Sequence, residues 1–168
     1  EDARQSQAYV FQSPIMLRRS VRQNLSYPLQ LLGLPKSEIT RRVDQWAGNI
    51  GLQDALDSPA PRLSGGEKQK LALGRALIRQ PKVLFLDEPC ANLDGRSTRE
   101  IESLLTAAAT AGTKIIMTTH DIGQARRLAT NILFLLGGAL HESGPASEFF
   151  NSPRTSEAKA FLKGDIVE

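Results

Sequence analysis

The chain contains 168 residues, 40% of them apolar, which is typical of a folded domain rather than a disordered segment. Lysine and arginine number 21 against 18 aspartates and glutamates, so the charge gives no reason to expect a nucleic-acid partner. The single cysteine, Cys90, excludes a disulfide framework and a cysteine-based zinc site, and favours a reducing compartment.

Short apolar runs and helical periodicities alternate along the chain. The run at residues 8–11 predicts a buried strand, and a short helix is expected at residues 20–25. Apolar residues recur at helical spacing between Lys36 and Ile50, and a proline-containing loop follows. The next helix is expected from about Gly65 to Arg79, where the following Pro81 ends it. No apolar run approaches the roughly 18 residues that span a bilayer, and no signal peptide is visible.

The second half continues the alternation. Two apolar runs at residues 82–87 and 114–119 are too short for typical helices and predict strands buried on both faces. Helices are expected around residues 101–108 and 124–129. Residues 131–143 predict a hairpin, because the glycine pair at its centre suits a tight primed turn. One or two short helices are expected to follow.

This order of elements predicts an α/β fold with a largely parallel sheet covered on both faces. Residues 20–61 contain predicted helices but no predicted strand, so we expect an α-helical subdomain inserted into the sheet core. We expect residues 1–19 to end an amino-terminal part of that core, and residues 62–168 to form the remainder.

The segment LSGGE places two glycines at the start of a helix, where glycine is the poorest helix former after proline. Ser64 and Glu67 fit a capping box, and this structural interpretation explains those two residues by itself. It does not explain Gly65 and Gly66, because a capping box tolerates almost any residue between its ends. A helix amino terminus presents free N–H groups and a partial positive charge. The bare positions therefore predict an anion site.

Two acids end the apolar run VLFLDEP. Because the carboxyl edge of a parallel sheet binds ligands, we expect Asp87 and Glu88 to lie at a site. Side chains alternate along a strand, so the two carboxylates are expected to point in different directions. Asp87 suits Mg²⁺, and Glu88 suits the orientation or deprotonation of a water. The alternative is an acidic strand end that starts a turn before Pro89.

Two further polar residues follow predicted strands. His120 lies just after the run at residues 114–119, so we expect it at the same sheet edge as Glu88. Gln12 follows the first predicted strand and offers a neutral ligand for a metal or a water. Either residue by itself also has a purely structural interpretation.

In order along the chain, these motifs resemble the nucleotide-binding domain of ABC-type ATPases, from Tyr9 to about Gly144. LSGGE resembles the family signature, VLFLDE the Walker B strand, and ANLD at residues 91–94 the D-loop. Gln12 resembles the Q-loop glutamine, and His120 resembles the switch histidine. The signature followed at short range by Walker B is the most specific part.

The resemblance implies ATP and Mg²⁺ as cofactors and assigns catalytic roles. Asp87 would hold Mg²⁺, with Gln12 sensing the metal and signalling to the partner. Glu88 would act as general base toward the attacking water, and His120 would contact the γ-phosphate. Catalysis of this kind is positioning and charge stabilisation of a phosphoryl transfer.

The resemblance also implies a dimer, formed with an identical subunit or with another ABC domain. Ser64, Gly65 and Gly66, with Glu67 beside them, would bind the γ-phosphate of ATP held by the opposite subunit. Asp94 would communicate across the dimer.

One departure from the family is large, because the chain contains no P-loop of the form G-x-x-x-x-G-K-[ST]. In the family this loop precedes the Q-loop, so we expect it before Glu1 and interpret the chain as the second half of an ATPase with its amino-terminal portion missing. We expect such a chain to bind ATP very weakly and not to hydrolyse it. We also expect an exposed apolar edge and poor solubility unless a partner supplies the rest.

The insert between Gln12 and Leu63 has a length that suits the helical subdomain of transporters, and residues 13–35 resemble importers of oxyanions such as tungstate. The implied partners are transmembrane permease subunits and, indirectly, a solute-binding protein, with no nucleic acid. The implied location is cytoplasmic, peripheral on the inner face of the cell membrane. The alternatives are a soluble ABC-type ATPase acting in translation or nucleic-acid metabolism, and a non-catalytic binding module.

Overall fold

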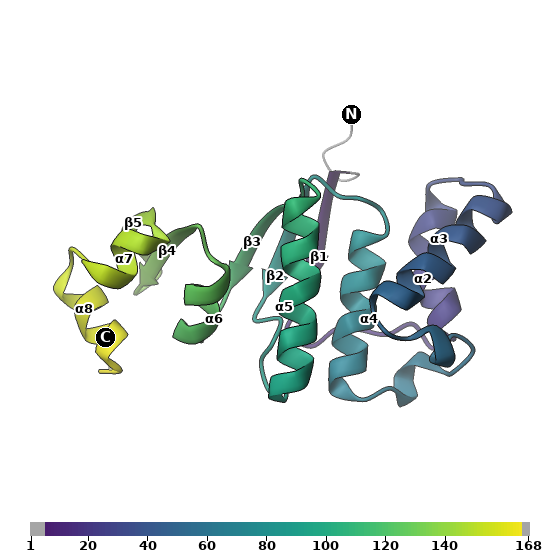
Figure 1. The fold of residues 1–168 in the computed structure, drawn as a ribbon, viewed down its shortest axis with the longest axis horizontal. Helices are drawn as coiled ribbons and strands as arrows, with labels where there is room; N and C mark the ends of the chain where they lie inside the picture. Colours follow the sequence, from purple (N-terminus) through teal and green to yellow (C-terminus); the bar gives the residue numbers. More distant parts are fainter. Residues whose placement is uncertain (1–5, 166–168) are drawn as a thin grey trace. The chain divides into compact units, whose positions relative to one another are not determined.

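Three parallel strands form the sheet of the first compact unit in the computed structural model, which describes residues 6–165 (Figure 1). The strands are β1 (Gln7–Val10), β2 (Val83–Asp87) and β3 (Lys114–Thr118), and they pair in the order β1-β2-β3. Both pairs are parallel, so the carboxyl ends of all three strands lie at one edge of the sheet. The predicted α/β fold with a parallel sheet is confirmed.

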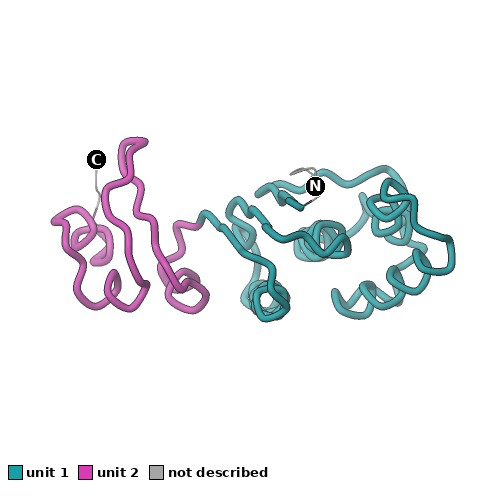
Figure 2. The backbone as a smooth tube through the Cα atoms, turned by 90° about the horizontal axis from the view of Figure 1, so that it is seen from above, with its two compact units in different colours: residues 1–118 teal, residues 119–168 magenta. Residues whose placement is uncertain are grey.

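The chain divides into two compact units between Thr118 and Thr119 (Figure 2). The first unit contains the parallel sheet and the longer helices, and the second contains a hairpin and shorter helices. The proposed boundaries at residues 1–19, 20–61 and 62–168 remain a prediction.

Helices cover one face of the three-stranded sheet. Helices α4 (Gly65–Leu77) and α5 (Gly95–Thr110) lie side by side along the strands (Figure 1), and beneath them Leu84 and Leu86 are at most 2% exposed. On the opposite face, Tyr9 is 53% exposed. The prediction that both faces are covered is therefore wrong for the described residues, because this face is exposed and apolar. The expected exposed apolar edge remains a prediction.

The exposed face of the sheet is a row of apolar side chains, one from each strand. Strand register places Tyr9 beside Phe85, and Phe85 beside Ile116. The Tyr9 and Phe85 rings stack with their centroids 6.3 Å apart, and Ile116 is 44% exposed. Successive side chains of a strand point to opposite faces, so the buried leucines of β2 alternate with this row.

Between β1 and α4, the chain forms helices α2 (Val21–Leu31) and α3 (Lys36–Asn49) and the short 3₁₀ turns η1 (Gln53–Ala55) and η2 (Ala60–Arg62). These elements share one apolar core with α4. Its fully buried members include Val21, Leu25, Leu29, Ala47, Leu71 and Ile78. The insert is helical, as predicted.

Helix α2 is longer than the short helix that the sequence predicts, and it continues through Pro28. Proline inside a helix removes one backbone hydrogen bond and costs about 3 kcal/mol. Leu25 and Leu29 lie four residues apart on one helix face, and both are 0% exposed. Burial of that face offsets the cost of Pro28, because each fully buried leucine contributes about 1.5–3 kcal/mol.

The second unit begins with α6 (Ile122–Leu128), and its strands β4 (Asn131–Leu136) and β5 (Ala139–Pro145) form the predicted antiparallel hairpin. The two turn glycines have φ of 55° and 77°, as a type I′ turn requires. Helices α7 (Ala146–Asn151) and α8 (Ser156–Lys163) complete the unit.

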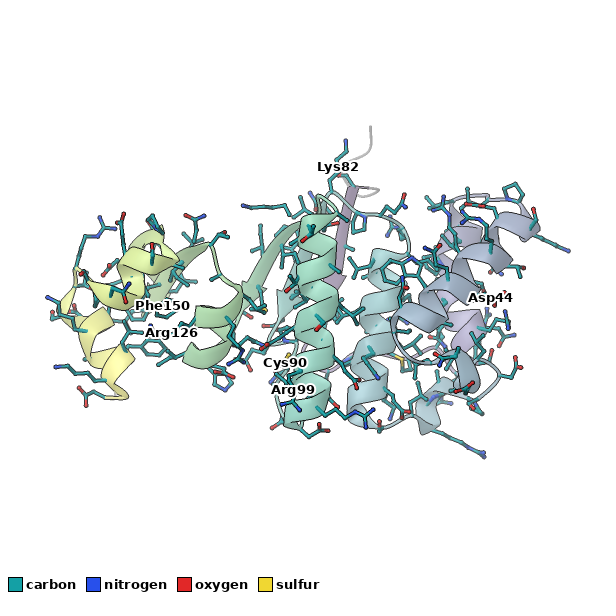
Figure 3. All side chains as sticks on the ribbon, in the orientation of Figure 1. Asp44, Lys82, Cys90, Arg99, Arg126 and Phe150 are labelled. Carbon is teal, nitrogen blue, oxygen red and sulfur yellow. The ribbon has the colours of Figure 1, made fainter. Side chains whose placement is uncertain are left out.

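Aromatic side chains hold the second unit together. Phe134 of β4 packs against Phe149 of α7 and Phe161 of α8, with ring centroids 5.8 and 5.3 Å apart. The Arg126 guanidinium lies over the Phe150 ring, 4.5 Å from its centroid (Figure 3).

Across residues 6–165, no helix has both the length and the apolar composition to cross a membrane.

Candidate functional site

The acid pair lies where β2 ends at the carboxyl edge of the sheet. Asp87 is the last residue of the strand, and its Oδ1 accepts a hydrogen bond of 2.7 Å from the Thr118 hydroxyl on neighbouring β3. The backbone turns sharply at Glu88, where φ is +41° in the left-handed region. The Glu88 N–H donates to the Thr118 carbonyl at 3.1 Å. Thr118 thus holds both acids, and the left-handed turn ends the strand alternation at Glu88.

Gln12 and Glu88 lie together at this edge. The Gln12 Nε2 group donates a hydrogen bond of 3.1 Å to Glu88 Oε2. The two residues are 76 positions apart, and they meet because β1 and β2 are adjacent parallel strands that end at the same edge. The structure therefore brings together three of the predicted site residues: Gln12, Asp87 and Glu88.

The donor atoms at this edge are the hard oxygens of Asp87, Glu88 and Gln12, which Mg²⁺ prefers. Within the described part of the chain, no group of three histidine, cysteine, aspartate or glutamate side chains could hold a metal. Mg²⁺ keeps several waters and is commonly held by one or two carboxylates together with substrate phosphates. The residues present fit Mg²⁺ bound in that way.

The predicted capping box at the start of α4 is confirmed. The Ser64 Oγ accepts from the Glu67 N–H at 3.3 Å, and the Ser64 N–H donates to Glu67 Oε2 at 2.9 Å. The Ser64 hydroxyl also donates to Glu67 Oε2 at 2.7 Å, and these bonds lower the pKa of Glu67. Because the single hydroxyl proton is directed at Glu67, Ser64 must rotate its O–H before it can donate to a phosphate.

The two glycines of LSGGE differ in their surroundings. A Cβ atom at Gly66 would lie 2.5 Å from Ser97 Oγ and 3.0 Å from Ser97 Cβ, so only glycine fits there without a shift. A Cβ atom at Gly65 would meet only Leu93, at an ordinary 3.9 Å. Packing against α5 thus explains Gly66 without an anion. The phosphate role of both glycines remains a prediction.

Asp94 is the N-cap of α5. Its Oδ1 accepts from the N–H groups of Arg96 at 2.8 Å and Ser97 at 2.9 Å, and its Oδ2 accepts from the Ser97 hydroxyl at 3.0 Å. These bonds, chiefly those from Ser97, lower the pKa of Asp94. Ser97 therefore touches both Asp94 and Gly66, and it joins the predicted D-loop to the start of the predicted signature helix.

His120 belongs to the second unit, as its second residue, and it is exposed. Its expected proximity to Glu88 remains a prediction. Sequence reasoning missed Thr118 and Ser97. Thr118 is the next-to-last residue of the strand predicted at residues 114–119, and Ser97 lies three residues after an N-cap aspartate, a typical capping position. Both signals were present but are common in sequences without a site.

The parallel sheet with two acids at its carboxyl edge defines the chain as an α/β protein, and ligands bind at this edge in such folds. A sequence profile described as ABC transporter matches residues 1–91, and the chain belongs to this family.

Relatives and solved structures agree with this assignment. The phosphate import ATP-binding protein PstB 2 of Natronomonas pharaonis is 36% identical, over 98% of this chain and 61% of its own length. The tungstate uptake system ATP-binding protein TupC of Peptoclostridium acidaminophilum is 40% identical, over 84% and 65% respectively. The solved structure of cbiO1 from Clostridium perfringens, part of the ABC transporter complex cbiONQ, matches 89% of this chain and 61% of its own, with a TM-score of 0.80 and 35% identity. The chain spans about half to two thirds of the length of the curated relatives it matches.

Proposed function

We propose that this chain carries the signature and Walker B parts of an ATP-hydrolysing subunit that drives solute import. The subunit acts as a dimer with transmembrane permease subunits, peripheral on the cytoplasmic face of the membrane. The observation that carries the proposal is the Gln12–Glu88 hydrogen bond of 3.1 Å, which joins the Q-loop glutamine to the general base beside Asp87. The import role is supported by relatives described as import ATP-binding proteins.

Each residue at the sheet edge has a role in this proposal. Asp87 and Gln12 would hold Mg²⁺, which would offset negative charge on the transferred phosphoryl group. Glu88 accepts a proton from the attacking water, and the hydrogen bonds from its N–H to Thr118 hold its left-handed backbone. His120, from the second unit, is proposed to contact the γ-phosphate.

The start of α4 completes the site for ATP bound to the opposite subunit. Ser64, Gly65 and Gly66 donate to its γ-phosphate, and Glu67 releases the Ser64 hydroxyl for this purpose. Asp94 couples the two nucleotide sites of the dimer, through its contact with Ser97. The helix terminus contributes about half a positive charge to this arrangement.

The 168-residue chain contains no P-loop, whose amides and lysine supply most ground-state contacts to the β- and γ-phosphates. We therefore propose that it binds Mg-ATP more weakly than micromolar and does not hydrolyse it. Isothermal titration calorimetry tests this, and micromolar affinity would contradict it.

The permease docks at the segment that follows Gln12, on Met16 and Leu17, with Arg18 and Arg19 beside them. Arg18 and Arg19 line a hollow of about 420 Å³, with Ser20, Asp57, Pro59 and Pro61. A solute-binding protein acts only through the permease. The proposed solute is an oxyanion, supported by the tungstate and phosphate relatives. Uptake of labelled tungstate, phosphate and methionine, with and without the gene, tests the solute class.

The variant Glu88→Gln tests the hydrolytic role in a full-length subunit that also contains a P-loop. We expect a loss of about 10²–10⁴-fold in kcat with nucleotide binding retained, the range for loss of a general base. Glu148→Gln, which neutralises an exposed acid in the second unit, is the matched control. Hydrolysis at the parental rate in Glu88→Gln would show that Glu88 is not the base.

A further inference from the structure

Helix α4 is connected to the loop of residues 15–20 by a polar network that the catalytic motifs do not include. We infer that Arg75 and Asn24 form a strut that makes this loop one rigid body with α4. The inference rests on the proposed function only in treating the loop as the permease-docking segment. Arg75 and Asn24 are therefore positioning residues, which act on the site through α4.

Asn24 holds the backbone of the loop from inside the protein. Its side chain lies on α2 and is 0% exposed. Its Oδ1 accepts from the Leu17 N–H at 3.1 Å, and its Nδ2 donates to the Ser20 carbonyl at 2.9 Å and, at 3.3 Å, to the Leu17 carbonyl. A buried amide with both ends satisfied by one loop fixes the path of that loop.

Arg75 extends this network to α4. One guanidinium nitrogen, Nη2, donates to the Ile15 carbonyl at 2.9 Å, and the other, Nη1, donates to Asn24 Oδ1 at 3.3 Å. Burial lowers the pKa of Arg75, but a guanidinium remains charged in proteins. The planar fork reaches two acceptors at once, which a lysine ammonium on a flexible stem does less well.

Helix α4 is well placed to act with this loop as one body. Gly74, next to Arg75, brings α4 close to α2, because a Cβ atom there would lie 3.3 Å from Leu25 and 3.1 Å from Ile50. Arg75 lies ten residues beyond Gly65, about 15 Å along the helix at 1.5 Å per residue. If the loop of residues 15–20 moves, α4 therefore moves with it, and the Ser64 end of the helix is displaced.

Amide hydrogen exchange on the 168-residue chain, followed by NMR together with urea unfolding, tests the strut. Arg75→Met removes both donors, and Arg75→Lys retains the charge with a single point of contact. Lys68→Met is the matched control, because it removes the same charge from the same helix. The Leu17 N–H keeps its acceptor, Asn24 Oδ1, but the loop loses the bonds from Arg75 that hold it. We therefore expect the Leu17 amide to exchange about tenfold faster in Arg75→Met, the factor for one lost hydrogen bond of typical strength.

The strut requires that this increase be confined to residues 15–20, while Leu73 of α4 and Leu84 of β2 exchange as in the parent. Arg75→Lys should recover at most part of the protection, and Lys68→Met should change nothing. Unchanged Leu17 exchange in Arg75→Met, a uniform increase through α2 and α4, or full recovery in Arg75→Lys would each overturn the inference. Because no nucleotide or permease is used, such a failure leaves the proposed ATPase function standing.

Discussion

Gly66 and Ser97 are in such close contact that a Cβ atom at position 66 would lie 2.5 Å from Ser97 Oγ. The Ser97 hydroxyl donates to Asp94, and the Ser97 Cβ belongs to the first turn of α5. Neither the Oγ nor the Cβ atom can therefore move away from position 66 without disturbing α5. The helix that carries the signature motif is thereby seated against the helix that follows the D-loop. Position 65, one residue earlier, has no such contact.

This contact predicts a sharp difference between two neighbouring substitutions. Gly66→Ala should lower the free energy of unfolding by about 1–3 kcal/mol, the usual cost of overpacking. Gly65→Ala should change it by at most about 0.5 kcal/mol, because alanine fits and is a better helix former. Urea unfolding of the two variants measures the difference. Equal effects would show that the Gly66–Ser97 contact does not determine which residue is tolerated.

Thr118 holds the acid pair, so its hydroxyl should contribute to the order of that edge. Thr118→Val keeps the shape but removes the donor to Asp87, and we expect it to lower the free energy of unfolding by about 1 kcal/mol. Thr118→Ser keeps the hydroxyl and should cost less. The NMR signal of the Glu88 amide, which donates to Thr118, should shift more in the valine variant. The same shift in both would rule out the hydroxyl as the cause.

Glu142 predicts a pH dependence for the second unit. It is 7% exposed and accepts hydrogen bonds from the N–H groups of Arg154 and Thr155, and these lower its pKa from 4.5 to about 2. A carboxylate with a lowered folded-state pKa stabilises the fold above its unfolded value. Its contribution should therefore be complete above about pH 5 and lost as the pH falls through 4.5 toward 2.

The measurement is the difference in Tm between the parent and Glu142→Gln across pH 2–7. The parent should be more stable at neutral pH, and the difference should shrink toward zero as the pH approaches 2. Glu148→Gln, an exposed acid in the same unit, should show no such trend. A constant difference across the range would mean that the Glu142 charge is not what stabilises the second unit.

The exposed row of Tyr9, Phe85 and Ile116 should bind apolar dyes and favour self-association. Ile116→Lys places a charge in this row and should reduce both anilinonaphthalene sulfonate fluorescence and the aggregated fraction in sedimentation. Leu31→Lys is the control, because Leu31 is 70% exposed but lies on α2. Similar reductions in both variants would locate the dye-binding surface elsewhere.

Local sequence signals predicted local structure well. The capping box at Ser64 and Glu67 depends on four consecutive residues, and the hairpin turn depends on two glycines that adopt positive φ. The strands β2 and β3 were recognised from their apolar runs. Their parallel pairing was predicted from the alternation of strands and helices along the chain. Short connections allow only a few topologies for such an alternation. The motif order alone was sufficient to recognise the family.

Contacts between distant segments were decided only by packing in three dimensions. No local pattern links the residues in three such contacts. They are the Gln12–Glu88 hydrogen bond, the Thr118–Asp87 hydrogen bond and the packing of Ser97 against Gly66. Helix α2 passes through Pro28 because burial of its leucines outweighs a local preference. Sequence periodicity indicates which face of a helix or strand is apolar. Which element packs against that face, and whether any does, depends on the tertiary structure of the whole chain.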